Sequence, residues 1–390
     1  MKNVKLSRAL AEIDKEFSKE TLDWLIGMYD GESGGFYYSQ SSIDTDRFEP
    51  DIESTTQALS ILTKMGLCHT DRSEDNGGFP EWFKEDIYSF LASRQDEGDG
   101  YFYDPVYRLT ANKAKKERNT AFVLNCFDNY IHKKPIYPTP MQRLKDKKTD
   151  AKASTDTAMY ESRESLYAWL EELYATKNSY CWGSDISAAR SMITAAGLLP
   201  DTVEWLKEKQ NTENGTWEKE FDMTAVNGVL KISGFFYSAT ESFPNYEIYA
   251  RNVIEFTKTF SPGSAAHAWN PMGSLRVILN NLPTPPTDEI SDMLKSGIAD
   301  MITNTTAKMR EFRQPDGGFG YGRRGPSRIS NEVEVSLGLP EGDVNALALM
   351  VLVHAEAYEL SGQGERNLWE EYHDYFFDAI KEKRSTAKGV

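Results

Sequence analysis

One short pattern recurs along this chain and limits what the chain can fold into. Its clearest copies occupy residues 205–217 and 90–102, where an aromatic-Leu pair, a Gln and a Gly-x-aromatic turn follow one another at the same spacing. Looser copies lie near residues 22–38, 169–183, 249–269 and 312–320. A helical segment precedes each turn and a second one follows it. Such a unit, repeated along a chain, is the sequence mark of stacked helical hairpins.

The two segments of each unit differ in composition. The second is more apolar and richer in Ala, as in residues 225–230 and 344–349. A helix buried on all sides needs no amphipathic stripe, whereas an outer helix buries one stripe and keeps a charged face. We therefore predict an all-α fold, an α/α toroid of about six helical hairpins with an inner and an outer ring around a central cavity. The last amphipathic segment, near residues 369–376, is predicted to close the ring against the first.

The bulk composition supports a single large domain. Hydrophobic residues make up 39% of the chain and aromatic residues 12%, which is enough for a large core. We predict that residues 1–390 form one toroid domain. Residues 133–160, rich in Lys, Asp and Pro, are predicted to form an exposed loop.

Charge and cysteine usage exclude several partners and locations. The formal net charge of −16 argues against a nucleic-acid partner. No stretch approaches the roughly 20 apolar residues of a membrane span, and the N-terminus lacks the apolar core of a signal peptide. Cys68, Cys126 and Cys181 are far apart and odd in number, which indicates reduced thiols. We predict a cytoplasmic protein, and the sequence does not fix its oligomeric state.

The repeated pattern resembles the QW-type repeat shared by terpenoid and squalene cyclases and the β subunits of protein prenyltransferases. The resemblance implies an α/α toroid in which the Gln and the aromatic residue tie an outer helix to the next inner one. The positions that take this structural role are Gln95, Gln210, Gln314, Phe102, Trp217 and Phe319.

The chain departs from the chemical motifs of those families, so it resembles a divergent, single-domain member. Prenyltransferases of this type use an Asp/Cys/His zinc site, but no Cys follows Cys181, so no metal and no cofactor is predicted. Alkene-protonating cyclases use Asp-x-Asp-Asp-Thr at the start of an inner helix. The corresponding segment here is residues 51–55, Asp-Ile-Glu-Ser-Thr. Glu53 stands at the position of the acid, and Ser54 at the position of the last Asp.

The N-termini of inner helices converge at the mouth of a toroid, and we expect a site there. The polar residues predicted at these positions are Asp51, Glu53, Arg118, Asn119, Asp185, Asp222, Asn270 and Asp343. Asp and Asn are also the preferred N-cap residues, so most of them can be explained as helix caps. Alternatively, several carboxylates in one enclosed space push their pKa values apart and supply a general acid and a general base.

The leading functional interpretation is a carbohydrate-active enzyme, either a glycoside hydrolase or a polysaccharide or oligosaccharide lyase. Its general acid would be Glu53 or Asp343, with Asp185 and Asp222 as base or substrate contact. The predicted substrate-binding residues are Asp51, Arg118, Asn119, Tyr38, Tyr103, Trp182, His267, Trp269, Tyr321 and Arg323. The aromatic side chains would stack on sugar rings, although packing is the more frequent use of any one of them. Arg323 would hold an anionic group, and a solvated loop explains it equally well.

Two alternatives remain open at this point. One is a terpenoid-cyclase-like or prenyl-transfer enzyme with an aromatic-lined cavity. The other is a non-catalytic helical scaffold that presents the face of the toroid to a binding partner. For an enzyme, the predicted partner is a small-molecule or oligosaccharide substrate. For the scaffold, it is a protein or an oligosaccharide. A list of the side chains on the cavity wall would separate the three interpretations.

Overall fold

The computed structural model describes residues 2–105, 113–146, 159–330 and 333–389. These residues are mostly helical, with one hairpin of two short strands. None of the helices among them is long and apolar enough to cross a membrane.

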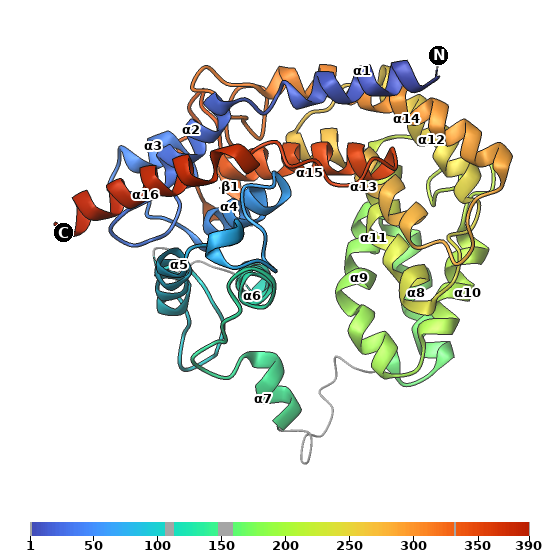
Figure 1. Ribbon diagram of the computed structural model, residues 1–390. Coiled ribbons are helices and arrows are strands. Elements are labelled where there is room, and N and C mark those ends of the chain that lie inside the picture. The colour runs from blue at the N-terminus through green and yellow to red at the C-terminus, as the bar shows by residue number, and fades with distance from the viewer. Residues whose placement is uncertain (1, 106–112, 147–158, 331–332, 390) are drawn as a thin grey trace.

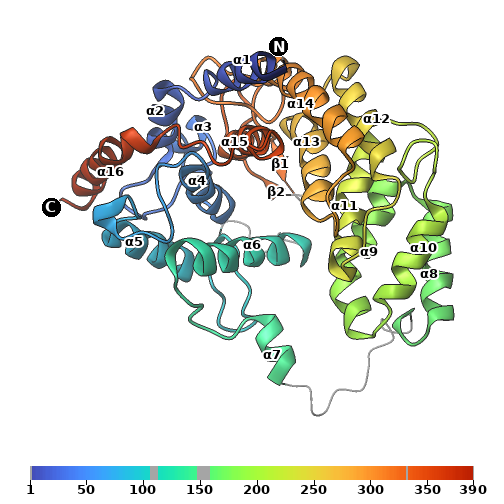
Figure 2. The same ribbon diagram turned by 45° about the vertical axis from the view of Figure 1, so that its right-hand side comes forward.

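The predicted all-α toroid is confirmed, because paired helices form an inner and an outer ring (Figures 1 and 2). The inner helices are α4 (Ile52–Lys64), α6 (Lys113–Cys126), α9 (Ser179–Ala195), α11 (Met223–Ala239), α13 (Ala265–Asn280) and α15 (Val344–Leu360). Each follows an outer partner, in the same order α2 (Lys19–Met28), α5 (Glu81–Ser93), α8 (Arg163–Thr176), α10 (Leu199–Lys209), α12 (Tyr246–Thr259) and α14 (Asp288–Met309). The described part of the chain thus holds the six expected hairpins.

The ring is closed on one side and open on the other. Helix α15 packs against both α4 and α13, and α11 packs between α9 and α13. Helices α6 and α9 stand apart in both views (Figures 1 and 2). The predicted exposed loop lies between them. It contains α7 (Pro140–Asp146), and its residues 147–158 lie outside the described part of the chain.

The ends of the chain lie outside the inner ring. Helix α1 (Lys2–Asp14) packs along α14 and α15, and α16 (His373–Lys388) packs against α2 (Figure 1). The prediction that the last helix closes the ring is therefore wrong, because α15 already contacts α4 there. The remaining elements are α3 (Gln40–Ile43), η1 (Glu74–Asn76), η3 (Phe127–Ile131), η5 (Arg310–Phe312), η6 (Glu370–Tyr372), β1 (Ile329–Ser330) and β2 (Val333–Glu334).

The Gln of each clear repeat is a structural joint, as the resemblance implied. The Gln210 Nε2 donates to the carbonyl oxygens of Gly215, at 3.0 Å, and Pro244, at 2.9 Å. The Gln95 Nε2 likewise donates to the carbonyl oxygen of Tyr137 at 2.8 Å, and its Oε1 accepts from the Tyr137 amide at 2.9 Å. Gln210 thereby fixes its own turn to a segment 34 residues later, and Gln95 to one 42 residues later.

Several inner helices begin earlier than the sequence suggested. Helix α9 starts after Asn178, whose Oδ1 accepts from the Cys181 amide at 2.9 Å, so Asp185 lies in the second turn. Helix α13 starts after Ser264, which places Asn270 in its interior. Helix α6 is described from residue 113, so Arg118 is likewise inside the helix. The true caps, Asn178 and Ser264, precede the polar residues predicted at the helix starts by seven and six residues, which the apolar pattern alone does not reveal.

Candidate functional site

A cavity of about 340 Å³ opens where the N-terminal ends of α4 and α15 meet α6 and the β1–β2 hairpin. Its wall is formed by Tyr38, Asp51, Glu53, Lys115, Arg118, Tyr180, Tyr321, Ser327, Ile329, Ser330, Val335 and Asn345. A space of this size suits a small organic ligand. The wall combines carboxylates, cations, tyrosine rings and two aliphatic side chains.

Glu53 is an ion-paired carboxylate on this wall. The Lys115 Nζ lies 3.0 Å from its Oε2 and the Arg118 Nη2 lies 2.6 Å from its Oε1. Burial acts to raise the pKa of Glu53, but the two cations outweigh burial and the pKa lies below its usual value. Glu53 is therefore held as an anion, which disfavours its predicted role as a general acid.

Asp51 is a carboxyl on the same wall, but its pKa is raised, whereas that of Glu53 is lowered. Its Oδ1 accepts from the Ser54 amide at 2.8 Å, capping α4 as predicted, and its Oδ2 accepts from the Ser54 hydroxyl at 2.6 Å. Burial raises its pKa to about 6, despite these hydrogen bonds. A carboxyl with this pKa retains its proton in about half of the molecules at pH 6 and in about a tenth of them at pH 7.

A second carboxyl, Asp104, supports this behaviour from outside the cavity wall. It is buried, and its Oδ1 accepts from the Ile52 amide at 3.1 Å, next to Asp51 in the chain. Burial, followed by the charge of Asp51, raises the pKa of Asp104 to about 7. The charge of Asp51 therefore acts on Asp104, and the protonation of one of these two buried carboxyls depends on that of the other.

Asp343 has a structural position beside the cavity. It caps α15 with its Oδ1 at 2.7 Å from the Ala346 amide, and its Oδ2 accepts from the Tyr321 amide at 2.6 Å. It is fully buried and does not line the cavity. Burial raises its pKa to about 7, although both amides and the Tyr38 hydroxyl lower it. Its contacts fix Tyr38 and Tyr321 at the cavity wall.

One cation, Arg118, lines the cavity, and a second, Lys231, lies near Tyr180 of the cavity wall without lining the cavity. Arg118 lies on α6, and Lys231 is a half-buried lysine on α11. Burial, and then the positive charge of Arg118, lowers the pKa of Lys231. No carboxylate partner of Lys231 is found among the residues that the structure describes. Its Nζ lies 5.8 Å from the ring centroid of Tyr180. This edge of the cavity is suited to an anionic group.

Two of the predicted acids lie away from this cavity. Asp185 is exposed on α9 and forms an ion pair with Lys177 at 2.7 Å. Asp222 caps α11 by accepting from the Ala225 amide at 2.9 Å. Neither lines the cavity, and each has an ordinary structural partner. The sequence could not separate them from Asp51, because all these positions favour a short acidic side chain.

Four of the predicted binding residues lie elsewhere in the fold, so the structure does not bring them to the cavity. Trp182 is buried against Trp205, with ring centroids 5.8 Å apart. The Trp269 Nε1 donates to the buried Glu356 at 2.8 Å. His267 lies near the start of α13 and Arg323 forms an ion pair with Glu311 at 2.7 Å; both are outside the cavity wall.

Asn119 and Tyr103 lie near the site without lining it. Asn119 follows Arg118 on α6 and is buried, and its Oδ1 has no hydrogen-bond partner in the described part of the chain. Tyr103 is buried with the Lys116 Nζ 4.4 Å from its ring centroid. The predicted residues that the structure does bring together are Tyr38, Asp51, Glu53, Arg118 and Tyr321.

Sequence reasoning missed several residues of this site. Lys231 had a usable signal, because it is the only charged residue in α11. Asp104 closely follows the Gly-x-aromatic turn at residues 100–102, where an Asp is unremarkable. Lys115, Tyr180 and Asn345 had no signal, since a Lys, Tyr or Asn near a helix start is ordinary.

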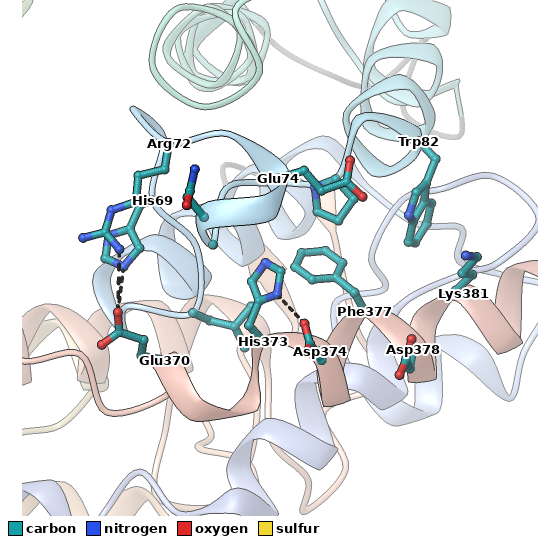
Figure 3. Close-up of a pocket in the computed structure, with 14 residues that line it drawn as sticks. His69, Arg72, Glu74, Trp82, Glu370, His373, Asp374, Phe377, Asp378 and Lys381 are labelled. Carbon is teal, nitrogen blue, oxygen red and sulfur yellow. Dashed lines mark hydrogen bonds and ion pairs between the residues drawn. The ribbon is translucent and has the colours of Figure 1, made fainter.

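A larger groove of about 630 Å³ lies on the outside of the ring, between α16 and residues 67–82 (Figure 3). His69 lies 3.7 Å from Glu370, and the His373 Nδ1 lies 3.1 Å from Asp374. The acids are solvated, with the side chains of Glu370 and Asp374 58% and 98% exposed. We therefore place the candidate site in the inner cavity. Among the described residues, no three His, Cys, Asp or Glu side chains converge in a way that could hold a metal ion.

Comparisons with known proteins give one solved structure to report. No family model matches the chain, and no curated protein matches it. A type II terpene cyclase from Scytonema, solved in complex with its product merosterolic acid A, is similar over 93% of this chain and 99% of that chain. The two share 12% sequence identity, with a TM-score of 0.41.

The prediction of a carbohydrate-active enzyme is wrong, because only Glu53 of its four predicted catalytic carboxyl groups lines the cavity. The site gives the physical reason. Glycoside cleavage needs two accessible carboxyl groups facing the same bond. Here Glu53 is neutralised by two cations, Asp343 is fully buried, and Asp185 and Asp222 lie away from the cavity.

Proposed function

We propose that this chain is a terpenoid-cyclase-like enzyme that protonates a carbon–carbon double bond of a small isoprenoid, with Asp51 as the proton donor. The observation that carries the proposal is a cavity-facing carboxyl whose pKa is raised to about 6 and which is backed by a second buried carboxyl. Protonation of an alkene requires an acid held in its neutral form inside an enclosed site. Asp51 is also the first residue of the segment 51–55, whose sequence resembles the alkene-protonating motif.

The rest of the wall suits the positive charge that protonation creates. Tyr38, Tyr180 and Tyr321 place three aromatic side chains on the cavity wall. The face of an aromatic ring attracts a cation, and this attraction strengthens where water is excluded. Ile329 and Val335 contribute apolar surface from the hairpin region and its flank. These five side chains are suited to an unsaturated hydrocarbon chain.

Arg118 and Lys231 supply the contact for an anionic end of the substrate. Guanidinium and ammonium groups bind phosphate oxygens through charge-assisted hydrogen bonds. Because Arg118 lines the cavity and Lys231 lies near Tyr180 of its wall, they would hold the anionic end at that edge and leave the hydrocarbon chain toward Asp51. We therefore propose an isoprenoid diphosphate as the substrate.

The chemical step conserves all atoms of the substrate. The O–H bond of Asp51 breaks, a C–H bond forms at the alkene, and the adjacent carbon becomes a tertiary cation. Attack by a second double bond closes a ring. Loss of a proton from a neighbouring carbon ends the reaction and returns a proton to the Asp51–Asp104 pair. The carbon–oxygen bond to the diphosphate stays intact.

A prenyl-transfer reaction is the second candidate, and the same Arg118 and Lys231 favour it. In that reaction the carbon–oxygen bond breaks and diphosphate is released. The two reactions therefore differ in one measurable product, inorganic diphosphate.

The test incubates the protein with geranyl, farnesyl and geranylgeranyl diphosphates and analyses the products by mass spectrometry after phosphatase treatment. We expect an isomer of the substrate and no released diphosphate. Asp51→Asn, which keeps the helix cap, should lower the rate by about 100-fold or more. The matched control is Asp185→Asn, outside the cavity. Full activity of Asp51→Asn, or no isomer from any of the three substrates, would refute the proposal.

A further inference from the structure

One face of the inner helix α11 is only partly covered by its neighbours. Between residues 225 and 238, the positions that are not buried share this face and are Asn227, Leu230, Lys231, Gly234, Tyr237 and Ser238. Asn227 accepts a hydrogen bond from the Asn270 Nδ2 of α13 at 2.6 Å. The Lys231 Nζ lies near Tyr180 of α9, on the other side. Because α13 and α9 flank α11 in the inner ring, the face between these two contacts points into the ring (Figure 2).

The guanidinium of Arg190 reaches this face from α9. A Cβ atom added at Gly234 would collide with the Arg190 Nη1, so the guanidinium occupies the place that a side chain at residue 234 would take. The guanidinium carbon also lies 6.0 Å from the ring centroid of Phe235. Residues 231 and 234 are one helical turn apart and therefore neighbours on the helix surface. Arg190 and Lys231 thus bring two positive charges to the same part of α11.

These two cations have no counter-charge in the part of the chain that the structure describes. Neither Arg190 nor Lys231 forms an ion pair or a side-chain hydrogen bond there, and both side chains are partly buried. Arg118, by contrast, is paired with Glu53. Two like charges that are close together and partly withdrawn from water repel each other. An arrangement that opposes folding in this way indicates a functional reason, and an anionic ligand would remove the repulsion.

The chemistry of the two side chains favours a diphosphate group. A guanidinium binds phosphate oxygens through two parallel N–H groups, and an ammonium binds them as a compact charge. A diphosphate carries its negative charge on two phosphoryl units, so it can contact two separate cations at once. The Lys231 end of the pair lies near Tyr180, which lines the cavity of the candidate site. A diphosphate bound to this pair would therefore lie beside that cavity.

We propose that Arg190 and Lys231 form a diphosphate-binding site on the inner face of α11. Arg190 contacts one phosphoryl unit and Lys231 the other, and no bond forms or breaks at this site. The inference rests on the proposed function for the source of the diphosphate, which is the isoprenoid substrate. Free inorganic diphosphate has the same chemistry and is the alternative source.

The first test measures the binding of inorganic diphosphate to the full-length protein by isothermal titration calorimetry, with EDTA present to remove divalent cations. We expect a dissociation constant of about 1 mM or lower. Arg190→Gln should weaken binding by about tenfold or more, because it removes the guanidinium. The matched control is Lys207→Gln, which removes one positive charge from the outer helix α10 and should change binding by less than about twofold.

A second variant displaces the guanidinium without changing any charge. Gly234→Ala places a methyl group where the Arg190 guanidinium lies, and this flexible side chain can move away without disturbing the helix. Binding of inorganic diphosphate should weaken by about fivefold or more. Gly27→Ala in α2 is the control, because its added Cβ has no neighbour within 4 Å. Circular dichroism confirms that each variant is folded.

Three outcomes of these titrations overturn the proposal. They are no binding by the unmodified protein, unchanged binding by both Arg190→Gln and Gly234→Ala, and an equal loss with Lys207→Gln. The last result would show that only the overall charge of the protein matters.

Turnover of farnesyl diphosphate separates this inference from the proposed function. If the substrate is the source, Arg190→Gln should raise KM by about tenfold and leave kcat nearly unchanged. Binding of inorganic diphosphate through Arg190 without any isomer formed would support the site, with free diphosphate as its ligand, and would refute the proposed function. An isomer formed with the same KM by Arg190→Gln would refute the site and leave the proposed function intact.

Discussion

The two walls of the ring are built from the same helical hairpin, and both bury apolar side chains, but they differ in the charge that they bury. The wall formed by α9 and α11 buries Trp182 against Trp217, with ring centroids 6.3 Å apart. The wall formed by α4 and α6 also buries Glu53 and Lys115, whose side chains are 7% and 4% exposed. This second wall therefore removes charge from water in addition to apolar surface.

This difference indicates which wall maintains the fold and which one serves chemistry. Burial of aromatic surface is the main favourable term in folding. Burial of an ion pair is close to neutral at best, because desolvation offsets the attraction between the charges. A chain that could have packed apolar residues between α4 and α6 holds charged ones instead. The placement of the proton-donating pair at the same wall is consistent with a functional reason.

The largest expected effect on stability is in the aromatic wall. Trp182→Ala should lower the free energy of unfolding by about 3 to 5 kcal/mol, because it removes a fully packed indole and leaves a cavity. Urea denaturation followed by circular dichroism measures it. The folded fraction should keep the activity of the unmodified protein. A loss below about 1 kcal/mol would show that this wall is not the packed one.

The next largest expected effect on stability is in the wall formed by α4 and α6, called here the charged wall. Lys115→Met should cost about 3 kcal/mol, because it leaves the buried Glu53 with the single, partly exposed Arg118. Adding Glu53→Gln to the same protein should recover most of this loss, since the only charge then left without its partner is that of Arg118, whose side chain is 43% exposed to water. Comparing the free energies of unfolding of the single and double variants separates two quantities: the cost of leaving Glu53 without Lys115, and the net contribution of the ion pair to stability. An additive loss in the double variant would contradict the buried ion pair.

A smaller effect, of opposite sign, is expected at Asp104. Its pKa of about 7 in the folded protein exceeds the unfolded value of about 3.9, so folding binds a proton and stability falls as the pH rises from 4 to 7. Asp104→Asn removes this pH-dependent loss of stability. It should stabilise the protein by about 1 to 3 kcal/mol at pH 8 and have little effect at pH 4. Denaturation midpoints at both pH values measure it, and an equal change at both would contradict the raised pKa.

The smallest predicted effect concerns the joint between hairpins. Gln210→Ala should cost about 1 to 2 kcal/mol, because the carbonyl groups of Gly215 and Pro244 lose their donor in a buried place. Gln95→Ala should cost about the same, as the equivalent joint on the charged wall. A clear difference between the two variants would show that the joints are not equivalent.

The fold could be predicted from the sequence because each copy of the repeat indicates one helical hairpin. The spacing of Gln210 to Gly215 is set by the turn that it closes, and Asp51 caps α4 where a short acidic residue precedes an apolar run. The start of α9 could not be predicted, because Asn178 lies well before the polar residue that resembled a cap. A cap is a local feature that several nearby residues can supply.

The site was predicted only in part, for a physical reason. Asp51 and Asp222 are both caps with the same local hydrogen bond, so their sequences look alike. What separates them is burial next to a second carboxyl, Asp104, which depends on contacts between distant segments. The pairing of Glu53 with Lys115 on the next inner helix is of the same kind. The carbohydrate interpretation failed because it counted carboxylates without knowing which ones were neutralised.

The most direct test of the account is the source of the proton. The reaction with an isoprenoid diphosphate is run in deuterium oxide with the unmodified protein, and the product is examined by mass spectrometry. The account predicts an isomer of the substrate that carries one deuterium on the protonated alkene carbon, formed by Asp185→Asn but not by Asp51→Asn. A product without deuterium, or one that Asp51→Asn forms at the full rate, would contradict protonation by Asp51.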